Sequence, residues 1–565
     1  MHFDNETADT PLFDRLLATS VDRRRLLQGS LAGLALSSLP LKLSAAPRRH
    51  GNLPFEPLRG QFEGTGLDLA EGFVADLLAT EGDQLTRTAK VGANHDFTAF
   101  LPIDRQRKGR DRSGVHRGFS PKDCSSREGL LVVNHEFPDT RFHGTLRTDY
   151  DNPPSPQRLR QEQESVGLSV LKVKRSGKEW SRRPHRLDRR IDALTPMRLS
   201  GPAAEIDGGP NATGTLGNCS GGTTPWGTVL SCEENYQVFA HRSGRSYLKW
   251  PEDTYARRHH GWVVEIDPFD PESTPIKRTA LGRFRHENVA VGVGKDGTVV
   301  AYMGDDRAGG HVYKFVCEDK LDPEARHGGR IDLLDRGRLY AADFEAGRWL
   351  LLERDAQPAL RAALDGNGEP RYPNQAAVVA DAYRAAGLVG ATPTHRPEDI
   401  EIHPHDDSVY IAFTNNRRAG DSFGKIVRLV ERDDDFAAME FTWDVFAEGG
   451  PESGFSSPDN LVFDEAGRLW MVTDSRTGRG EYEFLVRNSM FCFETEGEHA
   501  GIAHLFALAP PGSELTGPSW TPDGETLFLS VQHPGSGSSR EKPSTHWPRG
   551  GDHLPASAVL AIRGA

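Results

Sequence analysis

A four-part motif recurs along the chain and constrains its fold more than any other feature. Each copy has a polar triplet, a short apolar stretch, a turn rich in Asp, Asn and Gly, and a second apolar stretch that ends on acidic or amide residues. Four regular copies begin at His286, Pro397, Pro458 and Gly517, and two less regular copies begin at Asn94 and Asn218. Repeats of about sixty residues built from short strands are typical of propeller blades with insertions. We therefore expect an all-β protein, a six-bladed β-propeller with helical and loop insertions between the blades.

The apolar stretches have the composition of buried strands. They are rich in Val, Leu, Ile, Phe and Tyr, and a Gly, Asp or Asn turn precedes each of them, as in Thr298–Met303 and Val409–Phe413. Near-continuous apolarity indicates that both faces of each strand are covered, as they are near the centre of a propeller. Between the copies, Gln375–Leu388 has helical composition, and Leu360–Leu364 is a second, shorter candidate.

Length and charge limit the function classes. A chain of 565 residues could hold several domains, but one repeat extends over most of it, so we expect a single catalytic propeller over 92–565 after an extended segment over 47–91. The net charge of −13 argues against nucleic acid as a partner, because binding the phosphate backbone calls for a basic face. Five cysteines are an odd number, so at least one is free or is a ligand.

The N-terminus has the pattern of an export signal. Asp22–Gln28 fits the twin-arginine motif, an apolar run follows over Leu31–Leu43, and small residues stand at Ser44–Ala46. The run is shorter than the roughly 20 residues that span a bilayer, so we expect no stable membrane insertion. The sequence predicts a twin-arginine signal peptide over 1–46, the twin-arginine export machinery as a partner, and a periplasmic or extracellular protein exported in the folded state. A buried amphipathic helix is the alternative, and Pro47 leaves the cleavage site open.

Oxygen ligands recur at equivalent places in the copies. In a propeller, the innermost strands run beside the central channel, so the triplets and strand ends converge on one axis. Many carboxylates in such a channel need cations, because like charges at short range raise one another's pKa. Calcium takes six to eight oxygen ligands, and an added thiolate indicates a transition metal. The candidate metal ligands are Asn94, Asp96, Asn134, Glu136, Cys219, Glu233, Glu234, Glu287, Asp305, Glu398 and Asp459.

One of these candidates, Cys219, differs from the others in chemistry, and a nearby arginine adds a possible substrate contact. Any single Asp or Asn at a strand end is more often a turn residue, and it is the recurrence that favours the ligand interpretation. A cysteine is more often a buried apolar thiol than a ligand. Because Cys219 stands where other copies have Glu or Asp, the two interpretations are about equally favoured for it. Arg396 lies two residues before Glu398 and could hold an anionic substrate through a bidentate contact.

A set of motifs resembles those of the PhoX-type alkaline phosphatases. The likeness covers about Gly92 to the C-terminus and includes the twin-arginine leader. The segments that carry it are Cys219–Asn235, Gly282–Asn288, Met303–Asp306, Tyr313–Val316, Arg396–Asp399, Thr414–Asn416, Ser457–Asp459 and Val531–Pro534. Two departures, Phe137 where Tyr is usual and Asn460 where Gly is common, remove no carboxylate.

The resemblance implies a secreted, monomeric phosphatase that hydrolyses small phosphomonoesters to release inorganic phosphate. It also implies a cluster of two ferric ions and three calcium ions joined by a bridging oxo group. By similarity, Cys219, Glu287 and Glu398 would lie on the iron side, and Arg396 would contact the phosphate. Either Glu233 or Glu234 would point inward, and the choice stays open here.

Two other functions fit a propeller with axial acids. The first is a calcium-dependent lactonase or organophosphate hydrolase, from which Cys219 distinguishes the phosphatase, because a site for hard cations gains little from a thiolate. The second is a binding propeller without catalytic activity, in which metals only tie the blades together.

Overall fold

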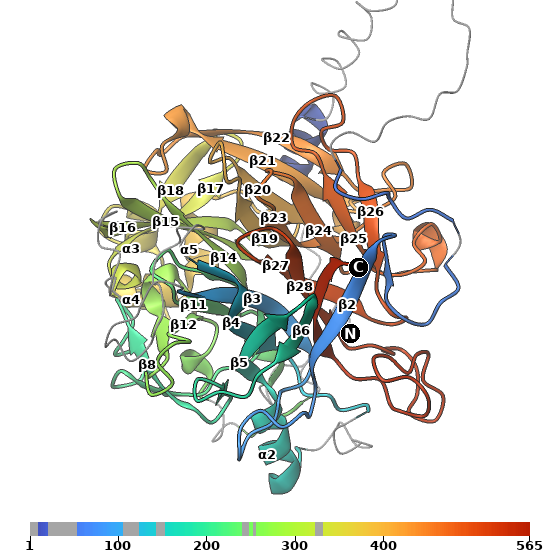
Figure 1. The fold of residues 1–565 in the computed structure, drawn as a ribbon. Coiled ribbons are helices and arrows are strands. Elements are labelled where there is room, and N and C mark those ends of the chain that lie inside the picture. The colour runs from blue at the N-terminus through green and yellow to red at the C-terminus, as the bar shows by residue number, and fades with distance from the viewer. Residues whose placement is uncertain are drawn as a thin grey trace, which may run out of the picture.

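The computed structural model describes residues 10–20, 53–60, 62–104, 124–142, 153–239, 248–251, 256–321 and 332–565. Six antiparallel or mixed sheets of four to six strands make up the body (Figure 1). Their innermost strands contact one another in the order β3, β10, β14, β19, β23, β27 and back to β3. This closed ring confirms the predicted six-bladed β-propeller.

Each blade takes its strands mainly from one stretch of chain. The first blade contains β3 (His95–Asp104), β4 (Cys124–His135), β5 (Gly167–Ser176), β6 (Glu179–Arg182) and β7 (Arg189–Ile191). The second contains β10 (Asn218–Thr223), β11 (Val229–Glu233), β12 (Val263–Ile266), β13 (Ile276–Arg278), β8 (Pro196–Ser200) and β9 (Asn211–Thr213). The third contains β14 (His286–Val293), β15 (Thr298–Asp305), β16 (Val312–Lys320), β17 (Gly337–Asp343) and β18 (Arg348–Leu351).

The other three blades follow the same order along the chain, except at their outer edges. The fourth contains β19 (Pro397–Ile402), β20 (Val409–Phe413), β21 (Lys425–Glu431) and β22 (Phe441–Glu448). The fifth contains β23 (Pro458–Phe463), β24 (Leu469–Thr473), β25 (Ser489–Phe493), β26 (His504–Leu508) and β1 (Asp68–Leu69). The sixth contains β27 (Glu514–Trp520), β28 (Thr526–Gln532), β29 (Ala558–Gly564) and β2 (Phe73–Thr80).

The ring is closed by the N-terminal part of the chain. β2 pairs antiparallel with β29, the last strand, so the sixth blade contains both ends of the propeller sequence. β1 likewise pairs with β26 at the outer edge of the fifth blade. The described part of the segment over 47–91 therefore supplies an outer strand to each of two blades.

A hydrophobic core lies at every blade interface, and this explains the apolar strands. In β15, Val299, Ala301 and Met303 pack toward the second blade, whereas Val300 and Tyr302 pack toward the fourth. The remaining four interfaces have equivalent clusters. Because alternate residues of one strand enter different cores, the strand needs apolar side chains on both faces.

Helices occur in the insertions between strands. Both predicted helical regions contain helix, although the longer one is interrupted at Asp381. The α-helices are α2 (Pro156–Ser165), α3 (Pro358–Ala362), α4 (Gln375–Ala380) and α5 (Ala382–Val389), besides a helix over 11–20. The 3-10 helices are η1 (Tyr236–Phe239), η3 (Arg257–His259), η4 (Thr279–Leu281), η5 (Leu333–Asp335), η6 (Arg417–Ala419), η7 (Arg432–Asp434) and η8 (Gly480–Tyr482).

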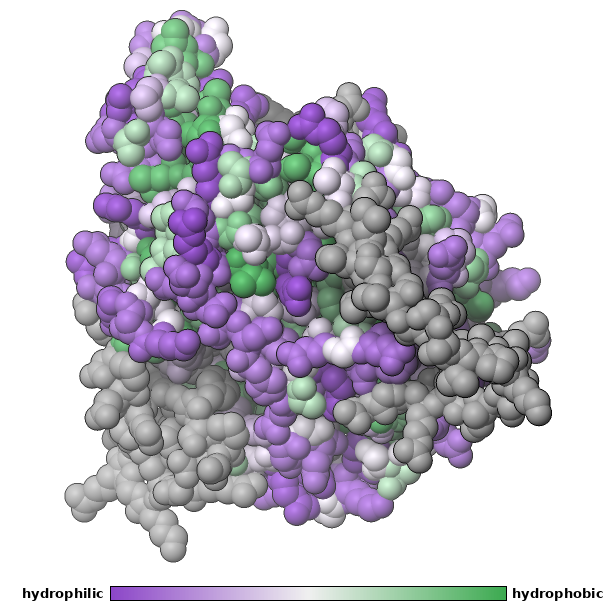
Figure 2. Space-filling view, turned by 90° about the horizontal axis from the view of Figure 1, so that it is seen from above, coloured by the Kyte–Doolittle hydropathy of each residue, from purple (hydrophilic) through white to green (hydrophobic). Residues whose placement is uncertain are grey.

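The face seen in Figure 2 is mostly hydrophilic, with hydrophobic residues in small groups between polar ones. Among the described residues, no helix combines the length and apolarity needed to cross a bilayer.

Candidate metal centre

An interruption in strand register recurs at the start of the innermost strand of every blade. In the third blade, the pairing of β14 with β15 shifts between His286 and Val289. A bulge of this kind re-aims a side chain, and bulges are common beside active sites. The other five shifts lie at His95/Thr98, Asn218/Gly221, Pro397/Ile400, Pro458/Leu461 and Thr516/Ser519. At each shift, the first residue named is the last one that pairs before the interruption. In five blades the residue that follows it in the chain lines one central cavity; these residues are Asp96, Cys219, Glu287, Glu398 and Asp459.

The sixth blade has glycine at this position. A Cβ on Gly517 would lie 2.3 Å from the backbone nitrogen of Thr98 and 2.6 Å from backbone atoms of Phe97, so the first and sixth blades leave no room for a side chain. The bulged triplet here is Thr516 to Pro518, one residue earlier than the sequence repeat suggests. In the first blade it begins at His95, one residue later than suggested.

A second set of acids follows the second strand of four blades. The residues paired with the triplets, such as Glu233 opposite Asn218 and Asp305 opposite His286, do not line the cavity. The next residue in the chain does so in each case, because successive side chains of a strand point to opposite faces. These cavity-lining residues are Glu136, Glu234, Asp306 and Asp474.

Register thus resolves the choice between Glu233 and Glu234. Glu234 lines the cavity, whereas Glu233 forms a fully buried ion pair with Lys277 (Oε1 to Nζ, 2.6 Å). Glu233 also accepts hydrogen bonds from the backbone N–H groups of Gly261 and Trp262. Burial alone would raise the pKa of Glu233, but the Lys277 ammonium and the nearby histidine lower it to about 2. Its carboxylate is engaged outside the cavity.

Two other candidate ligands are held in place by protein groups. Asp305 pairs with Arg307 (Oδ1 to Nε, 2.9 Å). Asn134 donates its Nδ2–H groups to the carbonyl oxygens of Cys219 and Ser220, at 2.8 and 2.9 Å. Neither residue lines the cavity, and Asn134 instead fixes the backbone that carries the thiol. Asn94 does line it, with its Nδ2 group donating to the carbonyl of Phe137 at 2.8 Å.

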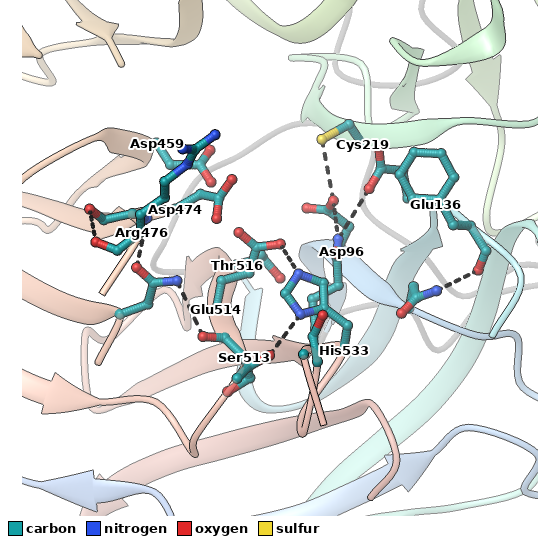
Figure 3. A pocket seen from close by; sticks show the side chains of 18 of the residues that line it. Asp96, Glu136, Cys219, Asp459, Asp474, Arg476, Ser513, Glu514, Thr516 and His533 are labelled. Atoms are coloured by element: carbon teal, nitrogen blue, oxygen red, sulfur yellow. Dashed lines mark hydrogen bonds and ion pairs between the residues drawn. The ribbon is translucent and has the colours of Figure 1, made fainter. Parts of the chain in front are cut away.

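The cavity ligands form three overlapping groups of potential metal donors. Within each group, one ligand atom per residue lies within 4.8 Å of the others. The groups are Asp96, Glu136 and Cys219; Cys219, Glu234 and Glu287; and Glu287, Glu398 and Asp459. Cys219 and Glu287 each belong to two groups, so the three form one continuous centre, part of which is shown in Figure 3.

The thiol is in direct contact with carboxyl groups on both sides. Cys219 Sγ lies 3.0 Å from Glu287 Oε1 and 3.3 Å from Asp96 Oδ2. Burial first, and the charges of Asp96 and Glu287 next, raise the pKa of Cys219 well above that of an ordinary thiol. A thiolate at this position therefore requires a nearby cation.

The acids of the centre are hard to ionise without added positive charge. Burial, with a contribution from Asp474, raises the pKa of Asp96 to about 7. Burial and then the charge of Asp96 raise the pKa of Glu136 to about 8. Burial likewise raises the pKa values of Glu234, Glu287, Glu398 and Asp459 well above normal. Closely spaced oxygen donors with one thiol fit hard cations beside a transition metal.

Arg396 contributes positive charge to the cavity. Its Nη2 group lies 2.7 Å from both Asp306 Oδ2 and Glu398 Oε1. Its backbone has φ +51°, an uncommon conformation for a residue with a side chain, and its buried Nε–H has no protein partner. The two carboxylates orient the guanidinium of Arg396, which lines the cavity.

Two cavity residues were missed by the sequence reasoning. Glu514 supplies a carboxylate from the sixth blade and lies 2.8 Å from His533 Nε2 (Figure 3). Gln532 donates from Nε2 to Asp96 Oδ2 at 2.7 Å. Gln532 is the amide residue near the end of the last copy of the motif, which was a usable signal. Glu514 precedes the triplet by two residues, so the repeat gave no indication of it.

The cavity has a volume of about 920 Å³, and basic side chains line it as well as acids. Arginines from the fourth and fifth blades, Arg417, Arg476 and Arg479, line it together with Tyr482. Arg417 donates from Nε to the Tyr482 hydroxyl at 3.1 Å. Positive side chains thus line the cavity together with the acids.

Comparison with known proteins identifies a family and similar solved structures. The family described as alkaline phosphatase PhoX matches residues 53–535. The structure of Pseudomonas fluorescens PhoX in complex with vanadate, a transition state analogue, is similar with a TM-score of 0.76 and 30% sequence identity over 90% of this chain and 98% of that one. A Dyadobacter fermentans protein of unknown function has a TM-score of 0.38 and 10% identity over 88% of this chain and all of that one. No curated protein matches the sequence.

Proposed function

Because this chain belongs to the alkaline phosphatase PhoX family, we propose that its central cavity hydrolyses small phosphomonoesters with the help of a mixed iron and calcium centre. The chain is an alkaline phosphatase, a phosphoric monoester hydrolase, by its family and by the fold that it shares with a PhoX enzyme. The finer assignments below are proposals that rest on the residues of the cavity.

The observation that carries the metal proposal is the thiol between two carboxyl groups. Cys219 bridges two of the three donor groups, and Glu287 bridges the third to them. We assign Cys219, Glu287 and Glu398 to the iron side, as the family resemblance suggests. Asp96, Glu136, Glu234 and Asp459 complete the donor set for two ferric and three calcium ions with a bridging oxo group. When bound, such cations stabilise the negative charge that spreads over phosphoryl oxygens.

The protein's own groups orient the substrate. Arg396 lines the cavity and would donate from its guanidinium to a phosphoryl oxygen while Asp306 and Glu398 fix the orientation of that group. A charged donor aimed at the oxygens that gain charge contributes to transition-state stabilisation. The phosphate thus meets positive charge in a protein whose net charge is −13.

Export of the folded protein is part of the proposal. Residues 1–46 would be the twin-arginine signal peptide, and the monomeric enzyme would act in the periplasm or outside the cell. The motif at 22–28 and the apolar run after it lie outside the described residues. The resemblance to an exported family and the twin-arginine pattern support this proposal.

Elemental analysis beside a phosphatase assay tests the metal centre. The purified enzyme should contain iron and calcium and should hydrolyse p-nitrophenyl phosphate with calcium dependence. Cys219→Ala should lose iron and activity together. Cys492→Ala is the matched control, because Cys492 is a buried thiol in β25 between the fifth and sixth blades. Iron retained in full by Cys219→Ala would overturn the thiolate assignment, and a native enzyme without iron would overturn the mixed centre.

A further inference from the structure

A short helix near the N-terminus lies against the side of the propeller. It covers residues 11–20 and is drawn in dark blue beside β22 in Figure 1. In the sequence it stands directly before the twin-arginine pattern at 22–28, and so within the predicted signal peptide. No residue of 10–20 lines the cavity of the metal centre.

Phe13 anchors the helix in an aromatic pocket. Its side chain is fully buried, and its ring centroid lies 5.0 Å from Phe413, 5.4 Å from Phe344 and 5.2 Å from the His395 ring. Trp443 stacks at 6.3 Å. Phe344 follows β17 of the third blade, whereas Phe413 and Trp443 lie in β20 and β22 of the fourth. The pocket therefore exists only where these two blades have packed together.

Polar contacts fix the direction of the helix. His395 Nε2 lies 2.8 Å from Thr10 Oγ1 and 2.7 Å from Asp14 Oδ1. Asn416 donates from Nδ2 to Thr10 Oγ1 at 3.1 Å. At the other end, Ser20 Oγ accepts a hydrogen bond from the backbone N–H of Val445 at 3.1 Å. Both ends of the segment thus have partners on the propeller.

The helix depends on this surface for its structure. Helices shorter than about 12 to 15 residues are marginal in water, so residues 11–20 gain their order from docking. We propose that residues 10–20 form a docking element that recognises the folded propeller at the junction of its third and fourth blades. In the precursor, the segment ahead of the twin arginines is then held to the body only after that junction has formed. Docking of this part of the signal peptide therefore distinguishes a folded propeller from an unfolded one.

Hydrogen exchange on the full-length chain tests the docking. In the wild type, amides of residues 14–20 should be protected, and Phe13→Ala should reduce that protection by roughly a hundredfold, as expected for loss of a buried aromatic anchor. Thr19→Ala is the control, because Thr19 is exposed and its hydroxyl donates to the carbonyl oxygen of Arg15 in the same helix. Phe13→Leu should restore part of the protection.

Denaturant gives a second, independent readout. As denaturant is raised, protection of 14–20 in the wild type should be lost no later than that of β17 and β20, because these strands build the pocket. Unprotected amides at 14–20 in the wild type would overturn the proposal, as would full protection in Phe13→Ala. Protection that survives unfolding of the two blades would also overturn it. Phosphatase activity is expected to be unchanged in all variants. The hydrogen-exchange result therefore tests the docking of the helix independently of the metal centre.

Discussion

Removal of the cations should make the stability of this protein strongly dependent on pH. Burial and mutual repulsion raise the pKa of Glu136 to about 8 and that of Asp96 to about 7. In the unfolded chain these groups titrate near 4.5 and 3.8. Between the two sets of values, the folded state binds more protons than the unfolded state. The free energy of unfolding of the stripped protein therefore falls as pH rises through this range.

The size of the effect follows from Glu136 alone. From pH 5 to pH 8 its carboxyl group costs the folded state about 4 kcal/mol, since each of roughly three pH units contributes about 1.36 kcal/mol. For a chain of 565 residues, this corresponds to a fall of about 3 °C in the unfolding temperature. The other raised acids act in the same direction. Bound cations replace the protons, so the loaded protein should show little of this dependence.

Thermal unfolding of chelator-dialysed and metal-loaded protein at pH 5 and pH 8 measures the difference. Glu136→Gln should reduce the pH dependence of the unfolding temperature of the dialysed protein by about 3 °C, because it removes one titrating group and leaves the other acids. Glu525→Gln is the control, because Glu525 is exposed and its carboxylate pairs with Arg175 at the surface. Equal unfolding temperatures of dialysed protein at the two pH values would refute the reasoning that cations neutralise these acids.

Three further substitutions test individual residues. Lys277→Met should destabilise the protein by about 3 to 5 kcal/mol in urea unfolding, because it leaves Glu233 buried and unpaired; wild-type stability would contradict the ion-pair role. Arg396→Ala should lower kcat/KM by about a hundredfold with unchanged metal content, and an unaltered kcat/KM would exclude the proposed phosphate contact. Gly517→Ala should lower the unfolding temperature, because its Cβ would meet the backbone of Thr98 at 2.3 Å, and an unchanged temperature would show that the two blades can move apart there.

The repeat in the sequence predicted the architecture because each blade is a local unit with its own strands and turn. It also indicated the inward residues of the triplets, among them Asp96, Cys219 and Glu287, which the bulges direct to the cavity. It could not choose within adjacent acidic pairs such as Glu233 and Glu234. That choice depends on the register between two strands, which a repeat does not encode.

Other parts of the site and fold could not be predicted for a different reason. Glu514 lies outside the triplet of its blade, where Gly517 is required by contact with the first blade. β1 and β2 pair with strands more than 400 residues away, and no local pattern identifies such partners. The pocket for Phe13 is likewise assembled from two blades that lie more than 300 residues further along the chain.

Closure of the sixth blade by β2 and β29 also orders events during synthesis. The ribosome makes β2 long before β29, so the sixth blade can be completed only after Ala558–Gly564 has emerged. Asp96 of the first blade gains its contact with Gln532 at the same late stage. The ring of blades around the binding centre therefore closes only after β29 has been synthesised and has paired with β2.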